Sequence, residues 1–246
     1  MNVYLDNAAT TPMLPEVVDA MLPYMRDHFG NPSSTHAFGR RTKTAIEQAR
    51  RRIATHLGVA PRTLCFTSGG TEADNMALHA SVEQLGCRRI LTCATEHKAV
   101  LTTAQHLAEE KGLAFGLLDL DSNGRIDLER LEATLSDGVP TLVSVMHGNN
   151  EVGILQDIEA IGHCCHRHDA LFHTDTVQTM GHYELDLASL PIDFAACSAH
   201  KLHGPKGAGF LYVRDGLRIG AHIMGGAQER AMPVSYTHLT LPTSIQ

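Results

Sequence analysis

Short apolar runs alternate with amphipathic stretches from residue 63 to residue 214, and this alternation constrains the fold more than any other feature of the chain. The apolar runs predict strands at 63–68, 88–94, 114–120, 140–146, 170–175, 193–199 and 207–214. The stretches between them predict helices at 71–85, 98–112, 127–135 and 157–168. This pattern indicates an α/β fold, in which helices cover both faces of a mostly parallel sheet.

The residues before this region predict two more helices. PEVVDAMLPYM at 15–25 has helical character, and a longer amphipathic helix runs from Arg41 to Leu57. Gly58 stands where a glycine commonly ends a helix. Between the two helices, FGNPSSTHAFG at 29–39 has the residues of a loop.

Composition excludes several classes of protein. The 246 residues are 43% hydrophobic, enough to bury a core, and the net charge of −7 argues against nucleic-acid binding. No apolar run approaches the roughly 20 residues of a membrane span, and the N-terminus MNVYLDNAATTP has no signal-like core. We therefore expect a cytoplasmic protein. Its six scattered cysteines lack the spacing of a disulfide framework.

Unusual polar groups follow the predicted strands. The segments SGGT, TEH, HGNNE, HTDTVQ and SAHK each come directly after an apolar run. Ligands of parallel sheets bind beyond the carboxyl ends of the strands. These segments therefore predict a single active site at one edge of the sheet.

The segment SGGTEADN has the features of an anion site. After a strand, two glycines lead into a helix that begins near Thr71. Free backbone N–H groups and the helix dipole favour an anion there, and Gly70 would let the backbone approach a phosphate closely. A routine strand-to-helix turn would look the same. No GK[ST] sequence follows Gly70, so the segment is not a P-loop.

Two side chains in HTDTVQ suit a pyridine-containing cofactor. Asp175 ends an apolar strand and could keep a ring nitrogen protonated, although a carboxylate there could also cap a loop. Gln178 can donate and accept hydrogen bonds, which suits a phenolic oxygen.

Lys201 and His97 are candidates for the chemistry. A lysine held in a partly buried site has a lowered pKa and can form a Schiff base, whereas a surface lysine would be a solvated charge. Ser198 and His200 could bind an anion beside it, and Lys206 is expected to be exposed. His97 could stack on a cofactor or transfer a proton, or it could cap the helix that it begins.

The chain resembles cysteine desulfurases of the NifS/IscS type, which are pyridoxal-phosphate (PLP) enzymes with the fold type I of PLP-dependent transferases. The resemblance runs from about Tyr4 to Glu229. Six motifs carry it in order: DNAATTP, SGGTEADN, TEHKAV, NNEVG, HTDTVQTMG and SAHKLHGPKG. Together they are specific for the family and less specific for the substrate.

The resemblance implies a role for each matching residue. Lys201 would bind PLP covalently, Asp175 would pair with the pyridine nitrogen, and Gln178 would contact the phenolic oxygen. His97 would stack on the ring and assist proton transfer. The phosphate would be held by Gly70, Thr71, Ser198 and His200. The substrate would lie near Asn7 and Asn150.

The resemblance also implies a reaction and partners. L-cysteine would give alanine and an enzyme persulfide, whose sulfur passes to acceptors such as iron–sulfur scaffold proteins. A homodimer is expected. A selenocysteine lyase, a cysteine sulfinate desulfinase or another aminotransferase-like PLP enzyme would share the lysine, aspartate and histidine. A cofactor-binding fragment without activity is a further alternative.

The sequence departs from the family after residue 232. We expect residues 1–15 to contribute to a small domain and the substrate site, and residues 16–233 to form the PLP-binding large domain. The tail 234–246, VSYTHLTLPTSIQ, matches no family segment and is expected to be foreign sequence. The family's sulfur-accepting cysteine and its small C-terminal domain would lie beyond residue 246.

None of the six cysteines matches the family's nucleophile. Cys197 is expected to be a buried apolar residue. The cluster HCCHRH could supply two or three zinc ligands, but a half-buried helix explains it better, and no metal site is expected.

Overall fold

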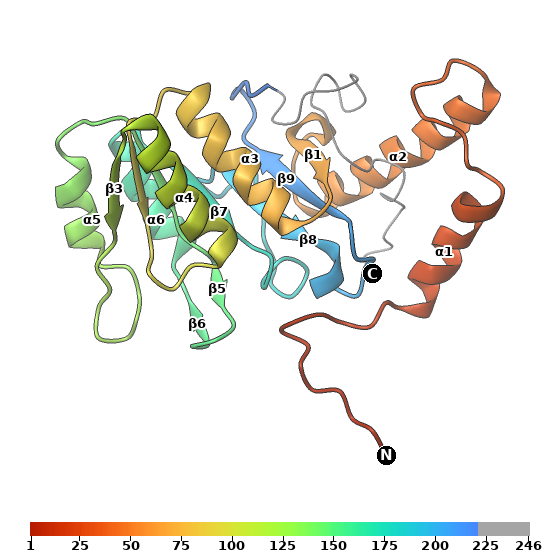
Figure 1. The fold of residues 1–246 in the computed structure, drawn as a ribbon, viewed down its shortest axis with the longest axis horizontal. Coiled ribbons are helices and arrows are strands. Elements are labelled where there is room, and N and C mark those ends of the chain that lie inside the picture. Colours follow the sequence, from red (N-terminus) through yellow and green to blue (C-terminus); the bar gives the residue numbers. More distant parts are fainter. Residues whose placement is uncertain (221–246) are drawn as a thin grey trace.

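The computed structural model describes residues 1–220, and a seven-stranded sheet forms its centre (Figure 1). The strands of this sheet are β1 (Leu64–Thr67), β2 (Arg89–Thr92), β3 (Ala114–Leu117), β4 (Thr141–Ser144), β7 (Leu171–Asp175), β8 (Phe194–Ser198) and β9 (Gly209–Val213). A separate hairpin, which the sequence did not predict, consists of β5 (Gly148–Asn149) and β6 (Ile154–Leu155).

The sheet has the strand order β1-β9-β8-β7-β4-β2-β3. Strands β3, β2, β4, β7 and β8 are parallel, which confirms the mostly parallel sheet, but β9 runs antiparallel to both β8 and β1. A parallel connection needs about a dozen residues or more. The loop between Ser198 and Gly209 is shorter than that, so the chain turns back on itself.

Six α-helices are described in residues 1–220, and they match the predicted helices within a few residues. They are α1 (Pro15–Arg26), α2 (Ala37–His56), α3 (Gly70–Glu83), α4 (Lys98–Lys111), α5 (Leu128–Leu135) and α6 (Ile158–Arg167). Two short 3-10 helices, η1 (Pro61–Thr63) and η2 (Ala199–Lys201), flank β1 and β8. Helix α2 starts earlier than the predicted Arg41, because the side chain of His36 accepts a hydrogen bond from the Gly39 amide and caps the helix there.

The helices cover both faces of the sheet (Figure 1). Helices α3 and α4 pack on one face, and α2, α5 and α6 pack on the other. The two-residue period of a strand divides its side chains between these layers. In β8, Ala195 and Cys197 join the core under α2, whereas Phe194 and Ala196 join the core under α3.

The N-terminal segment lies against the loop that follows β8. The amide of Thr11 donates to the carbonyl of His200 at 2.9 Å, and the amide of Leu14 donates to the carbonyl of His203 at 3.1 Å. Residues 8–14 therefore lie beside the end of the sheet where Lys201 is found. The predicted boundary at 233 and the tail 234–246 lie outside the described residues.

Within residues 1–220, no helix is both long enough and apolar enough to cross a bilayer.

Candidate active site

A cavity of about 270 Å³ lies where the carboxyl ends of β7 and β8 meet the N-terminus of α3. Parallel strands bring their carboxyl ends to one edge of a sheet, so groups far apart in sequence converge there. The cavity is lined by all nine residues that were predicted to hold the cofactor: Gly70, Thr71, His97, Asn150, Asp175, Gln178, Ser198, His200 and Lys201. Its other lining residues were not predicted: Ala9, Asp74, Met146 and Val177.

Lys201 is partly buried at the end of η2, directly after β8. Its Nζ donates a hydrogen bond to the backbone carbonyl of Ala8. Burial lowers the pKa of Lys201, while the nearby carboxylates of Asp175 and Asp6 act in the opposite direction. The lowered pKa increases the fraction of neutral amine, which is the form that attacks a carbonyl carbon.

Asp175 is the last residue of β7 and is 5% exposed. Its Oδ1 accepts a hydrogen bond from the amide of Val177 at 2.8 Å. Burial, followed by the neighbouring Asp74, raises the pKa of Asp175 to about 7. A cation in the cavity would favour the ionised carboxylate, because a nearby opposite charge stabilises the charged form.

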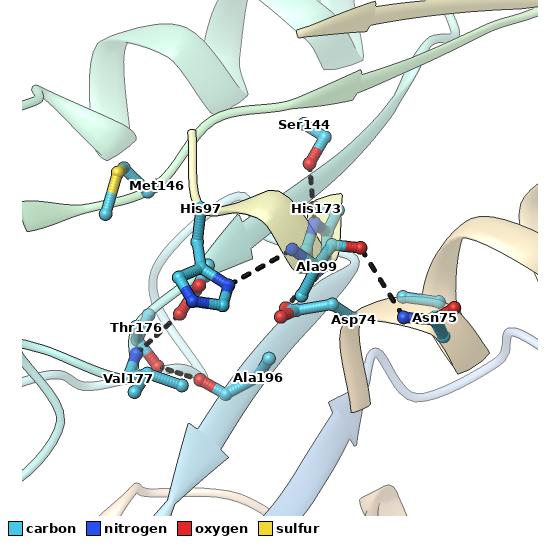
Figure 2. Close-up of polar contacts among 12 residues, drawn as sticks. Asp74, Asn75, His97, Ala99, Ser144, Met146, His173, Thr176, Val177 and Ala196 are labelled. Carbon is cyan, nitrogen blue, oxygen red and sulfur yellow. Dashed lines mark hydrogen bonds and ion pairs between the residues drawn. The ribbon is translucent and has the colours of Figure 1, made fainter. Parts of the chain in front are cut away.

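His97 caps α4, as one interpretation of the sequence expected. Its Nδ1 accepts a hydrogen bond from the Ala99 amide at 3.1 Å (Figure 2). The ring nevertheless lines the cavity. Because Nδ1 is the acceptor, Nε2 carries the hydrogen of the neutral ring. The capping bond therefore sets the tautomer and leaves Nε2 as the atom that can exchange a proton with a ligand.

The turn before α3 is open to an anion. Helix α3 begins at Gly70, and no side chain caps its N-terminus. A Cβ atom at Gly70 would lie 2.5 Å from Cγ2 of Val177, so glycine is required for this close packing. The amide of Ser68 donates to the side chain of Glu72 at 2.7 Å, which holds the turn in shape. The first N–H groups of the helix thus remain available to a phosphate.

Three further predicted residues border this turn and the N-terminal segment. Ser198 is buried at the end of β8. Nδ1 of His200 lies 3.1 Å from the hydroxyl of Thr10, and burial lowers the pKa of this histidine. Gln178 donates through Nε2 to the carbonyl of Ala8 at 3.0 Å. The carbonyl that accepts from Lys201 therefore also orients Gln178.

The β5–β6 hairpin presents Asn150. Its neighbour Asn149 donates through Nδ2 to the carbonyl of Thr95 at 2.7 Å and accepts from the amides of Glu151 and Val152. These bonds fix the loop and place Asn150 on the cavity wall.

Asn7 is the one predicted site residue that the structure does not bring to the cavity. It is exposed and absent from the lining residues. The N-terminal segment contributes Ala9 and the carbonyl of Ala8 instead.

Asp74 is the polar lining residue that sequence reasoning missed. It is 1% exposed, and burial raises its pKa to about 8. A signal was available, because Asp74 lies four residues after Gly70 and so on the same face of α3. The expectation for SGGTEADN concerns Gly70, Thr71 and the helix N-terminus, and it leaves Asp74 without a role.

All six cysteines of the chain are buried: Cys65, Cys87, Cys93, Cys164, Cys165 and Cys197. Burial raises the pKa of the Cys197 thiol above its ordinary range, as expected for a core residue. Cys164 and Cys165 pack in the core beneath α6. Across residues 1–220, no group of three or more His, Cys, Asp or Glu side chains is arranged to hold a metal ion. Lys206 is exposed, as predicted.

The groups around the cavity fit PLP. A partly buried amine, a buried carboxyl group, an uncapped helix N-terminus and a serine hydroxyl all border one space. These are the partners that an aldehyde, a pyridine nitrogen and a phosphate each require.

Comparison with known proteins agrees with this geometry. Residues 3–243 match the family described as aminotransferase class-V. The chain is 45% identical over 231 residues to a protein of Bacillus subtilis (strain 168) named putative cysteine desulfurase IscS 1. That alignment covers 93% of this chain and 60% of the relative, so the chain spans about three fifths of the relative's length.

Two solved structures share the fold. One is a NifS-like protein that is 39% identical, with a TM-score of 0.91, over 97% of this chain and 67% of that one. The other is SspA in complex with cysteine, which is 36% identical, with a TM-score of 0.89, over 97% of this chain and 70% of that one.

Proposed function

The chain belongs to the class-V aminotransferase family, and from this membership we propose that it is the PLP-binding part of a cysteine desulfurase. The observation that carries the proposal is the convergence of nine motif residues on one cavity, with the amine of Lys201 among them. The name of the Bacillus subtilis relative and the cysteine bound to SspA support L-cysteine as the substrate.

The chain's own residues would hold the cofactor at three points. Lys201 would bind its aldehyde, and the ionised Asp175 would accept the hydrogen of the ring nitrogen. The N-terminus of α3, with Thr71, Ser198 and His200, would bind the phosphate. When bound, PLP supplies an electron sink for the charge that remains when a proton leaves the substrate's α-carbon.

His97 is the residue we assign to proton transfer. Its Nδ1 is occupied by the Ala99 amide, so Nε2 would be the exchanging atom. The ring would also cover one face of the cofactor. Gln178, oriented by the Ala8 carbonyl, would meet the phenolic oxygen, and Asn150 would lie beside the substrate.

The cysteines support a further part of the proposal. Transfer of sulfur needs an accessible thiolate, and all six thiols of this chain are buried. We therefore propose that the 246-residue chain binds PLP but does not turn over cysteine by itself. An assay for alanine would contradict this if it detected turnover that Lys201→Ala abolished.

The family resemblance alone supports the remaining parts of the proposal. They are a homodimer and delivery of the sulfur to an iron–sulfur scaffold or another acceptor protein.

The first prediction tests the lysine. Adding PLP to the purified chain should produce the absorbance of a covalently bound cofactor, and Lys201→Ala should abolish it, because the amine is lost. Lys206→Ala is the matched control, since Lys206 is an exposed lysine five residues away, and it should leave the spectrum unchanged. A wild-type spectrum in Lys201→Ala would overturn the assignment.

A further inference from the structure

Two buried atoms beside the cavity face one another without a hydrogen-bond partner. Oδ1 of Asp74, on α3, lies 3.4 Å from Nε2 of His173, on β7 (Figure 2). The two side chains are 1% and 0% exposed, and neither atom has a hydrogen-bond partner within residues 1–220. Buried polar atoms of this kind are rarely left unpaired, because each would lose the hydrogen bonds that it makes to water in the unfolded chain. A proton between the two atoms would satisfy both.

The opposite nitrogen of His173 is already paired. Its Nδ1 lies 2.8 Å from Oγ of Ser144, a hydroxyl that can donate or accept (Figure 2). If Nδ1 donates to Ser144, Nε2 is an acceptor and needs a donor. Protonated Asp74 is the group in position to provide it.

The surroundings favour the proton on Asp74 over an ion pair. Burial raises the pKa of Asp74 to about 8 and lowers that of His173 to about 4. Two other buried carboxyl groups, Asp175 and Glu96, lie close enough to interact with Asp74, and burial raises the pKa of each. Other titratable groups around these carboxyls are His97 at the N-cap of α4, Cys197 on β8 and Lys201 on η2. Several carboxyls in one desolvated space cannot all be ionised.

We propose that Asp74 is a positioning residue that stays protonated at neutral pH and donates its proton to Nε2 of His173. The pair then has no net charge, and Asp175 is left as the carboxyl that ionises when a cation enters the cavity. The part of this inference that concerns the ring nitrogen of PLP rests on the proposed function.

The test is Asp74→Asn, whose amide can still donate to His173 but cannot ionise. Between the ordinary aspartate pKa and about 8, the folded wild type holds a proton that the unfolded chain has released, so this residue makes stability fall as pH rises. The variant lacks that dependence. From pH 5 to 8, the wild type should therefore lose stability relative to the variant. Its unfolding equilibrium constant should rise, relative to that of the variant, by up to about tenfold per pH unit.

Thermal unfolding followed by circular dichroism provides the measurement. Asp137→Asn is the matched control, because this exposed carboxylate is paired with Arg89, has a lowered pKa and is ionised in both states across that range. A stability difference between Asp74→Asn and wild type that is constant from pH 5 to 8 would show an ordinary carboxylate at Asp74 and overturn the proposal.

Nitrogen NMR of the wild-type chain keeps the proposal testable even if the variant does not fold. With ¹⁵N-labelled histidine, His173 should be neutral at pH 7, with Nε2 as the unprotonated nitrogen. His173→Gln identifies its signal. A doubly protonated ring at pH 7 would place the proton on the histidine and contradict the assignment.

A separate measurement, of PLP affinity against pH, tests whether Asp74 influences cofactor binding. Above pH 8, the ionised Asp74 of the wild type would repel an anionic cofactor, so PLP affinity should fall less in Asp74→Asn than in wild type between pH 7 and 9. An equal fall in PLP affinity in both chains would show that ionisation of Asp74 does not affect cofactor binding. The unfolding and NMR measurements use no cofactor, so a failure of the Lys201 test would leave the Asp74–His173 pair standing.

Discussion

Gly70 shows how a single missing side chain shapes the cavity. Its backbone lies against Val177, which follows β7, and this contact joins the helix N-terminus to the strand end that bears Asp175. The branched side chain of valine is stiff and cannot move aside easily. A methyl group at Gly70 would therefore push the first turn of α3 away from the cavity.

Gly70→Ala should weaken PLP binding and lower the free energy of unfolding by about 1–3 kcal/mol, the usual cost of overpacking. Titration with PLP and chemical unfolding measure the two effects. Adding Val177→Ala removes the Cγ2 atom that the new methyl group would meet, so the double variant should regain part of both losses. No recovery in the double variant would argue against a steric cause.

Among the elements, α6, β7, β8 and β9 are joined by one buried carboxylate. Asp193 precedes β8 and is fully buried. It accepts hydrogen bonds from the amide of Phe172 at 2.7 Å and from Nε of Arg214 at 2.6 Å, and its Oδ2 lies 3.1 Å from Nε2 of His166. This residue therefore helps to hold the register of β7, which ends at Asp175, and of β8, which leads into η2 and Lys201.

Asp193→Ala should lower the free energy of unfolding by about 1–3 kcal/mol or more, because the buried Phe172 amide loses its acceptor. Asp119→Ala is a suitable comparison, since its ion pair with Arg130 is solvent-exposed and should contribute about 0–1 kcal/mol. Denaturant unfolding followed by circular dichroism measures both variants. An equal loss in the free energy of unfolding for the two variants would mean that the hydrogen bonds of Asp193 stabilise the sheet no more than an exposed ion pair does.

At the scale of the whole molecule, the N-terminal segment borders the cavity because it packs against the segment that follows β8. Thr11 is 5% exposed, and its hydroxyl donates to the carbonyl of His200 at 2.9 Å and accepts from the amide of His203 at 2.8 Å. These bonds place Ala8 and Ala9 beside Lys201.

Thr11→Val keeps the shape of the side chain but removes its hydroxyl, so the docking of the N-terminal segment should weaken by about 1–3 kcal/mol. Hydrogen exchange at the amides of Thr11 and Leu14 should become faster. Thr44→Val, on the exposed face of α2, provides the control and should leave these amides protected. Unchanged exchange in Thr11→Val would mean that other contacts hold the segment.

The sequence by itself determined the elements and the motif positions. The periods of two and 3.6 residues are local properties, so the strands of the seven-stranded sheet and the helices from α3 to α6 could be predicted within a few residues, whereas the short β5–β6 hairpin could not. The glycines and polar groups after each strand likewise marked the carboxyl edge of the sheet, where Asp175 and Lys201 line one cavity.

Tertiary structure alone decided the contacts between distant segments. The reversal of β9, the carbonyl of Ala8 at Lys201, the exposure of Asn7 and the pairing of Asp74 with His173 leave no periodic signal in the chain. Each depends on which surfaces pack together and on the burial that results. Burial is also what raises the pKa of Asp74, because desolvation is a property of the folded environment and not of the residue.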